Sequence, residues 1–195
     1  MAAASTVGSP STQGEMLSVD MAEMRVTSRL TDHLVAYGLG ACIAICLYDP
    51  ALKVAGMAHI VLPQKRAFNH GAATEAAEAS PGKFVDTAIP LLLEQLKRGG
   101  AQLSSLRAAV AGGSHIFSAV RTGLPSGLEI GERNVAAAHR LLEHHAIALC
   151  AEDVGASHGR TVVFRVSDGA VIVKPIGGEA RVLAVLSKHV EEAAQ

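Results

Sequence analysis

The stretch YGLGACIAICLYDP, residues 37–50, sets two glycines and a cysteine at the start of an apolar run. Residues 42–48 are rich in Ile, Leu and Cys, which is typical of a buried strand. Asp49 and Pro50 occupy the first two positions of a predicted turn, and residues 54–62 form a second apolar run. The pattern therefore predicts a β-hairpin.

The length of the hairpin loop decides which side chains face each other. If residues 49–52 form the loop, Tyr48 pairs with Lys53 and Cys42 falls directly opposite His59. Opposed residues share a face of the sheet, with Cβ atoms about 4.5–5.5 Å apart. A loop with an odd number of residues would place Cys42 and His59 on opposite faces. The even loop also collects the apolar residues on the other face, namely Ile43, Ile45, Leu47, Val54, Gly56 and Ala58.

The remaining patterns predict strands and helices in mixed order. One or two strands are expected in residues 16–26, others at 106–111 and 146–151, and a hairpin at 160–176 around Asp168-Gly169. Helices are predicted at 83–98, starting from Ser80-Pro81 and kinked or shortened by Pro90, at 131–145 and at 181–194. We therefore predict an α+β fold, a single domain with largely antiparallel β-sheets packed with two main helices.

Composition limits the possible classes of function. The chain has 195 residues, of which 49% are hydrophobic and 3% aromatic, and its formal net charge is -1. This length suits one domain, and the charge offers neither a nucleic-acid footprint nor a polybasic membrane patch. No apolar run is long enough to cross a bilayer, so no direct membrane insertion is expected.

The number of cysteines and the sequence of the N-terminus indicate the cellular compartment of the protein. Three cysteines are too few for a disulfide framework, and the first residues lack the pattern of a signal peptide. We therefore expect a cytoplasmic protein. Residues 1–16, rich in Ala, Ser and Thr, are predicted to be a disordered tail, and residues 17–195 the domain.

Cys42 and His59 can form a nucleophile and its base. An imidazole can take the proton of a thiol, and the glycines before Cys42 allow backbone amides to face an oxyanion. Such a pair performs acyl transfer from amides, esters or thioesters. Packing in the core is the alternative for both residues. A metal site built from Cys42, Cys46 and His59 is a weaker alternative, because no second cysteine pair accompanies it.

Several stretches resemble the CheD chemoreceptor glutamine deamidases, in the same order and spacing over residues 16–178. They are GLGACIAICLYDP, GMAHIVLP, GKFVDTAIPLLLEQLKRGGA, AAVAGGSHIF and IGERNVAAAHRLLEHHAIALCAEDVGASHGRTVVF. The resemblance implies a CheD-like cysteine hydrolase fold and a protein-glutamine glutaminase. That enzyme would convert glutamines of methyl-accepting chemotaxis receptors to glutamates, with possible glutamyl methylesterase activity. It also implies catalytic Cys42 and His59, no metal or organic cofactor, and a possible CheC-type phosphatase partner.

The chain departs from the family pattern at two positions. The family threonine six residues before the cysteine is Ala36 here, and the serine before the cysteine is Ala41. Thr31, Ser114 and His115 can be considered as replacements for the lost hydroxyl.

The departure at Ala36 supports an alternative. The chain can be a weakly active or inactive CheD homologue that acts as an adaptor for receptors or a CheC-type phosphatase. An enzyme is expected to show a low-pKa Cys42 that reacts with thiol probes well below pH 8. A general cysteine amidase with a small-molecule substrate is a third reading.

Overall fold

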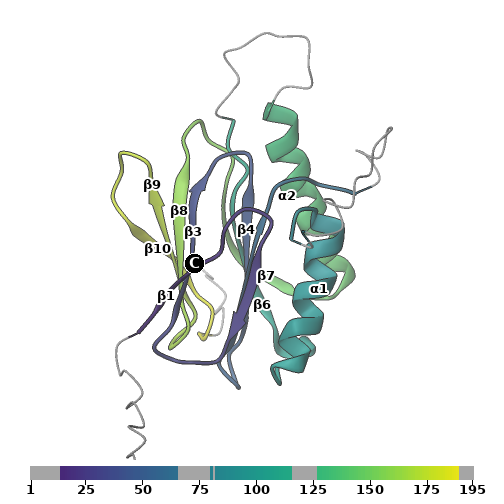
Figure 1. Ribbon diagram of the computed structural model, residues 1–195, viewed down its shortest axis with the longest axis vertical. Coiled ribbons are helices and arrows are strands. Elements are labelled where there is room, and N and C mark those ends of the chain that lie inside the picture. The colour runs from purple at the N-terminus through teal and green to yellow at the C-terminus, as the bar shows by residue number, and fades with distance from the viewer. Residues whose placement is uncertain (1–13, 66–79, 81, 116–126, 189–195) are drawn as a thin grey trace, which may run out of the picture.

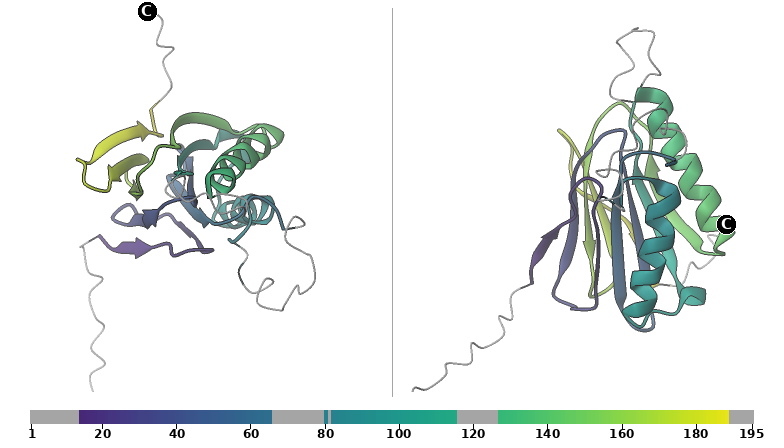
Figure 2. Two further views of the ribbon diagram at one scale, coloured as in Figure 1. Left: turned by 90° about the horizontal axis from the view of Figure 1, so that it is seen from above. Right: turned by 45° about the vertical axis from the view of Figure 1, so that its right-hand side comes forward.

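The computed structural model describes residues 14–65, 80, 82–115 and 127–188. Within them, ten strands form two five-stranded sheets, and two α-helices are present. Figures 1 and 2 show three layers: one sheet, then the other, then the helices. The two helices cover only one of the sheets, so the chain is a β-sandwich with a helical layer on one outer face.

The strands of each sheet come from separate parts of the chain. Sheet A has the order β1 (Met16–Ser18), β3 (His33–Leu39), β8 (Arg160–Arg165), β9 (Ala170–Pro175) and β10 (Arg181–Val185). Sheet B has the order β2 (Met24–Thr27), β5 (Val54–Ile60), β4 (Ile43–Asp49), β6 (Arg107–Gly112) and β7 (Ala148–Val154). Two pairs are parallel, β1 with β3 and β6 with β7, and the other six are antiparallel. The predicted α+β class with largely antiparallel sheets is confirmed.

Two apolar cores hold the layers together. The first lies between sheet B and the helices α1 (Val85–Arg98) and α2 (Gly127–His144). Its members on β4 and β5 include Ile43, Ile45, Leu47, Val54 and Ala58, as the hairpin pattern predicts. The second lies between the two sheets and takes the opposite faces of the same strands, with Ala44, Cys46, Tyr48, Ala55 and Met57. Strand alternation thus sends the two faces of one hairpin into two different cores.

Two details of the predicted elements are wrong, and one strand is missing from the prediction. Helix α1 begins at Val85, close to the predicted start at residue 83, but its N-cap is Phe84, which provides no side-chain cap, and not Ser80. Pro90 lies in its second turn and does not shorten it, since the helix continues to Arg98. Residues 181–185 form strand β10 and not a helix, because they pair antiparallel with β9 at the edge of sheet A. Strand β3 was not predicted at all.

The register of the β4–β5 hairpin also differs from the prediction. Ala44, and not Cys42, pairs with His59, and Asp49 pairs with Val54. The reason is the Asp49 carboxylate, whose Oδ1 accepts from the amides of Ala51 and Leu52 and so extends β4 by one residue before the turn. The shift is two residues, an even number. Cys42 and His59 therefore stay on one face, as diagonal rather than direct neighbours.

The predicted disordered tail, residues 1–16, lies largely outside the described residues and stays a prediction, although Met16 opens β1.

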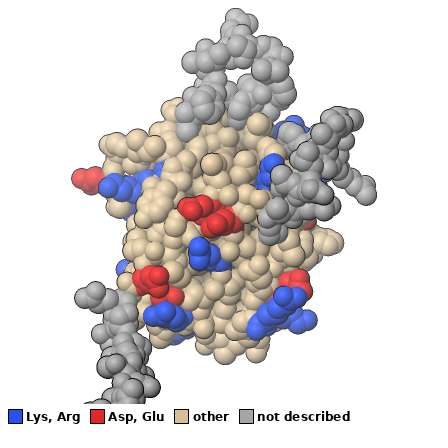
Figure 3. Space-filling model, in the orientation of Figure 1, with Lys and Arg blue, Asp and Glu red and all other residues tan. Residues whose placement is uncertain are grey.

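The face of the molecule in Figure 3 carries acidic and basic side chains in small separate groups. Among the described residues, neither helix has the length and apolar character needed to cross a bilayer.

Candidate active site

Three side chains of interest face the space between the sheets. Ala36 on β3 belongs to the core between the sheets, and Cys42 packs against the same core. His59 shares this face of β5 with Ala55 and Met57 by strand alternation. The fold therefore brings the family positions Ala36, Cys42 and His59 to one inner surface.

A backbone carbonyl orients His59. Its Nδ1 lies 3.1 Å from the carbonyl oxygen of Val19, and the Val19 amide donates to the Val35 carbonyl at 2.8 Å. Because a carbonyl oxygen only accepts hydrogen bonds, Nδ1 must carry the hydrogen. In a neutral imidazole, Nε2 then holds the free lone pair, which is what a general base needs. This Nε2 is buried and has no partner among the described residues.

Burial keeps both groups neutral at rest. Desolvation lowers the pKa of His59, against the smaller effects of the Val19 carbonyl and the Asp20 charge. Desolvation also raises the pKa of the Cys42 thiol, against a smaller opposing effect of its own backbone. The expectation of a low-pKa thiol in the unliganded protein is therefore wrong. Slow labelling below pH 8 would not identify an adaptor, because deprotonation by His59 can accompany attack.

Three consecutive carbonyls fix the backbone around Cys42. The Gly40 carbonyl accepts from the Ser114 amide at 2.7 Å, and the Cys42 carbonyl accepts from the Gly113 amide at 2.8 Å. Between them, the Ala41 carbonyl accepts from the side-chain amide of Asn134 at 2.9 Å. In a trans peptide the N–H points opposite to the C=O. Anchoring the Ala41 carbonyl therefore sets the direction of the Cys42 N–H.

Gly113 leaves this N–H available. Its φ of +65° is in the left-handed region, and its carbonyl oxygen lies against Gly131 of α2. The carbonyl is therefore turned away from the regular ladder position opposite Cys42. Among the backbone hydrogen bonds of the turns and loops in the described residues, none has the Cys42 N–H as its donor. The arrangement suits an oxyanion-hole donor.

The close approach of Gly131 to Gly113 yields a prediction. A Cβ on Gly131 would lie 2.6 Å from the Gly113 carbonyl oxygen, a backbone atom that cannot swing aside. Alanine in a helix is favoured over glycine by about 1 kcal/mol, but crowding of this kind costs about 1–3 kcal/mol. We expect Gly131→Ala to lower the free energy of unfolding, measured by urea denaturation, and to lower activity. A stabilised, fully active variant would contradict the assigned contact.

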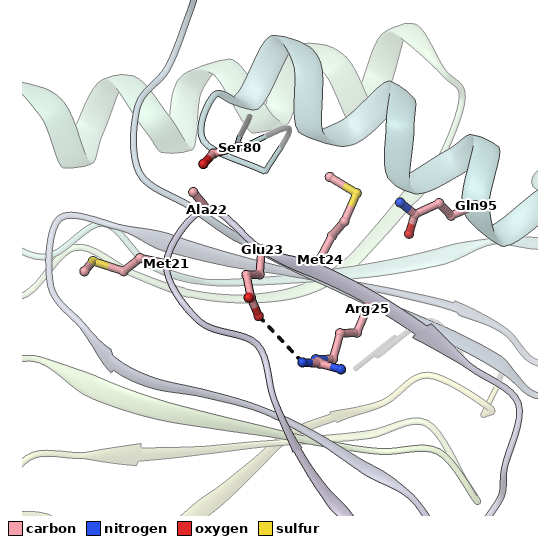
Figure 4. Close-up of a pocket in the computed structure, with 7 residues that line it drawn as sticks. All are labelled: Met21, Ala22, Glu23, Met24, Arg25, Ser80 and Gln95. Carbon is pink, nitrogen blue, oxygen red and sulfur yellow. Dashed lines mark ion pairs between the residues drawn. The ribbon is translucent and has the colours of Figure 1, made fainter. Parts of the chain in front are cut away.

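A cavity reaches His59. It has a volume of about 330 Å³ and is lined by Val19, Asp20, Met21, Tyr37, Gly38 and His59. A larger cavity of about 490 Å³, shown in Figure 4, shares Met21 but lies on the other side of the same segment, against β2 and α1. Its charged lining residues, Glu23 and Arg25, pair with each other, and neither Cys42 nor His59 borders it. The smaller cavity, whose lining includes His59 but not Cys42, is therefore the candidate route for a substrate side chain.

The other sequence candidates do not join the site. Thr31 is exposed, Ser114 donates to the His158 carbonyl and accepts from Arg160, and His115 pairs with Glu132. Cys46 is fully buried between the sheets, where desolvation raises its pKa. Among the described residues, no group of three or more His, Cys, Asp or Glu side chains can hold a metal ion. The proposed metal site of Cys42, Cys46 and His59 therefore has no support.

Sequence reasoning missed two contributors. Val19 acts through its carbonyl, which leaves no mark in the residue type. Asn134 lies in the IGERN stretch quoted above, but nothing in the spacing shows that its side chain reaches Ala41. The structure adds one signal of its role: Asn134 is completely buried on α2, and a buried polar side chain normally has hydrogen-bond partners.

Comparison with known proteins places this chain in a family. Residues 61–175 match the family described as CheD chemotactic sensory transduction, a match that begins just after His59. The chain is 39% identical to "Chemoreceptor glutamine deamidase CheD" of Thermotoga maritima, over 74% of this chain and 83% of that protein. It is 35% identical to "Probable chemoreceptor glutamine deamidase CheD" of Desulforamulus reducens, over 86% and 95%. The corresponding protein of Desulfitobacterium hafniense is 40% identical, over 86% and 98%. The family match and these relatives together show that the chain belongs to the CheD family.

Proposed function

We propose that this protein is a protein-glutamine deamidase. It converts glutamine side chains of methyl-accepting chemotaxis receptors to glutamates through a thioester on Cys42. The relatives carry the name chemoreceptor glutamine deamidase, which supports the substrate class. The hydrogen bond from His59 Nδ1 to the Val19 carbonyl carries the mechanism, because it leaves Nε2 as the base on the face that Cys42 shares.

The first half of the reaction forms the thioester. Nε2 of His59 takes the thiol proton as the Cys42 sulfur attacks the glutamine side-chain carbonyl. The oxyanion is stabilised by the Cys42 N–H, which faces away from the anchored Ala41 carbonyl. The protonated His59 then gives its proton to the amide nitrogen, the C–N bond breaks and ammonia leaves.

The second half releases glutamate. Water attacks the thioester carbonyl while His59 Nε2 takes one of its protons. The C–S bond breaks, and the proton returns from His59 to the Cys42 sulfur. A glutamyl methyl ester has the same acyl carbon, with methanol as the leaving group. The proposal therefore includes glutamyl methylesterase activity, performed by the same two residues.

The adaptor alternative rests on Ala36 in place of the family threonine. The Val19 carbonyl already occupies His59 Nδ1, so the lost hydroxyl is not needed to orient the ring. This contact favours the enzyme over the adaptor. A cytoplasmic location remains an expectation from the cysteines and the N-terminus, and a CheC-type phosphatase partner remains an expectation from the resemblance.

A substitution at Ala36 tests this point. Ala36 is fully buried between the sheets, so Ala36→Thr should lower the free energy of unfolding by about 1–3 kcal/mol. We expect kcat of the folded protein to stay within about threefold of the unsubstituted value, because orientation of His59 does not depend on residue 36. Steady-state kinetics below the melting temperature give the answer. A tenfold rise in kcat would show that His59 is poorly oriented by Val19.

The function itself is tested on a receptor. A cytoplasmic receptor fragment from the same organism is incubated with the protein, and its peptides are analysed by mass spectrometry. We expect conversion of glutamine to glutamate at defined positions, with ammonia released in equal amount. If no position changes and the receptor is still bound, the adaptor replaces the enzyme.

A further inference from the structure

The side chain of Asn134 bridges two strands where they separate. Strands β4 and β5 are paired as far as Ile43 and Ile60. The residue that follows β5, Val61, instead donates its amide hydrogen to the Lys83 carbonyl. At this fork, Asn134 Nδ2 donates to the Ala41 carbonyl at 2.9 Å and to the Val61 carbonyl at 3.0 Å.

The chemistry of the amide fits both contacts. A side-chain amide nitrogen carries two hydrogens, and a carbonyl oxygen accepts hydrogen bonds but cannot donate them. The contacts thus determine which end of the Asn134 side chain faces the fork. Asn134 is completely buried, and its Oδ1 has no partner among the described residues. An unsatisfied buried acceptor is unfavourable, so this asparagine is not the residue that stability alone would select.

The two anchored carbonyls belong to the two halves of the reactive pair. The Ala41 carbonyl lies in the same peptide plane as the Cys42 N–H, and Val61 follows His59 by two residues. One side chain on α2 therefore holds the nucleophile segment and the base strand at a fixed separation. No backbone ladder performs this task beyond Ile43 and Ile60 in the described pairing.

We propose that Asn134 is a positioning residue that aligns the Cys42 amide and His59 for catalysis. The proposal rests on the function proposed above. It assigns to Asn134 no contact with the substrate, so its loss should affect the chemical step more than substrate binding.

Two variants separate the effect of the Asn134 N–H donors from the effect of the side-chain volume. Asn134→Asp keeps the shape and, as a carboxylate, offers the two carbonyls only acceptor oxygens, whereas Asn134→Ala removes both donors. For each, we expect kcat on the receptor fragment to fall about 10- to 100-fold, with KM within about threefold. Because Asn134→Asp conserves volume, it serves if the alanine variant does not fold.

Tyr48→Phe is the matched control. The Tyr48 hydroxyl is also buried and donates to a backbone carbonyl, that of Val166, at 2.9 Å. Its loss removes the same kind of bond at the far end of β4, in contact with the core between the sheets. We expect a lower melting temperature with kcat within about twofold of the parent protein. The comparison distinguishes positioning from general stability.

A second readout does not require the receptor. Iodoacetamide alkylates the Cys42 sulfur with loss of iodide, and the rate at neutral pH depends on proton transfer to His59. We expect both Asn134 variants to react at least fivefold more slowly than Tyr48→Phe near pH 7, and all rates to converge at high pH, where the thiol ionises unaided. Convergence at high pH combined with a defect at neutral pH supports the proposal.

The two readouts keep the failures apart. If the parent protein does not deamidate the receptor, the proposed function fails. The rate of Cys42 alkylation then remains as the test of the role of Asn134. If the Asn134 variants keep both kcat and the alkylation profile of Tyr48→Phe, Asn134 is purely structural and the inference is overturned.

Discussion

Cys42→Ala is expected to abolish deamidation, with a loss of at least about 10³-fold in kcat/KM. The thioester requires a sulfur at this position, and without it only the oxyanion donors and substrate binding remain. The fold should persist, because Cys42 is only half-buried and the carbonyl and amide contacts of this segment belong to its backbone. Mass spectrometry of the receptor fragment measures the loss, and circular dichroism checks the fold.

Cys150→Ala is the matched control for this variant. Cys150 is also half-buried, but it lies on β7 at the edge of sheet B. We expect full activity from Cys150→Ala. Equal activity of Cys42→Ala and the parent protein would remove Cys42 from the mechanism. A trapped thioester on the parent protein, detected by mass spectrometry after acid quench, would identify the sulfur directly.

His59→Gln is expected to lower kcat by about 10²- to 10⁴-fold, the usual contribution of a general acid and base. KM should change little, because His59 does not bind the amide until the sulfur attacks. Glutamine keeps a polar group near the Val19 carbonyl but supplies no base of suitable pKa. A kcat within tenfold of the parent value would show that another group, or solvent, takes the thiol proton.

The same variant has a consequence for stability against pH. Burial lowers the pKa of His59 in the folded protein, so the unfolded chain binds the proton more readily. The resulting stabilisation is complete above the unfolded pKa of about 6.5 and is lost progressively as pH falls below it. Urea unfolding between pH 7.5 and pH 5 should therefore show a smaller loss of stability for His59→Gln than for the parent protein. Identical slopes would indicate that His59 is not buried in its neutral form.

Much of the site was already visible in the sequence. The alternation in residues 42–60 placed Cys42 and His59 on one face, because an even shift in register preserves the face of every side chain. The same alternation assigned Ile43, Ile45 and Leu47 to the opposite core. These results depend only on the period of a strand, which is a local property of the backbone.

Other features were beyond a reading of local patterns. The hairpin register depended on the Asp49 carboxylate, and residues 181–185 became a strand because β9 offered them an open edge. Their own composition does not separate helix from strand, so a long-range partner made the choice.

The sequence by itself determined the α+β class and the family resemblance, and it supplied the two residues that we propose as the reactive pair. Only the tertiary structure shows which group contacts His59 Nδ1, because that group is the Val19 carbonyl, and every residue carries a carbonyl. It also revealed the contact of Asn134, which lies far along the chain from Ala41 and meets it only because α2 packs on sheet B. Side-chain types and periodicity are written in the sequence, whereas contacts between backbone groups of distant segments arise only when the layers pack.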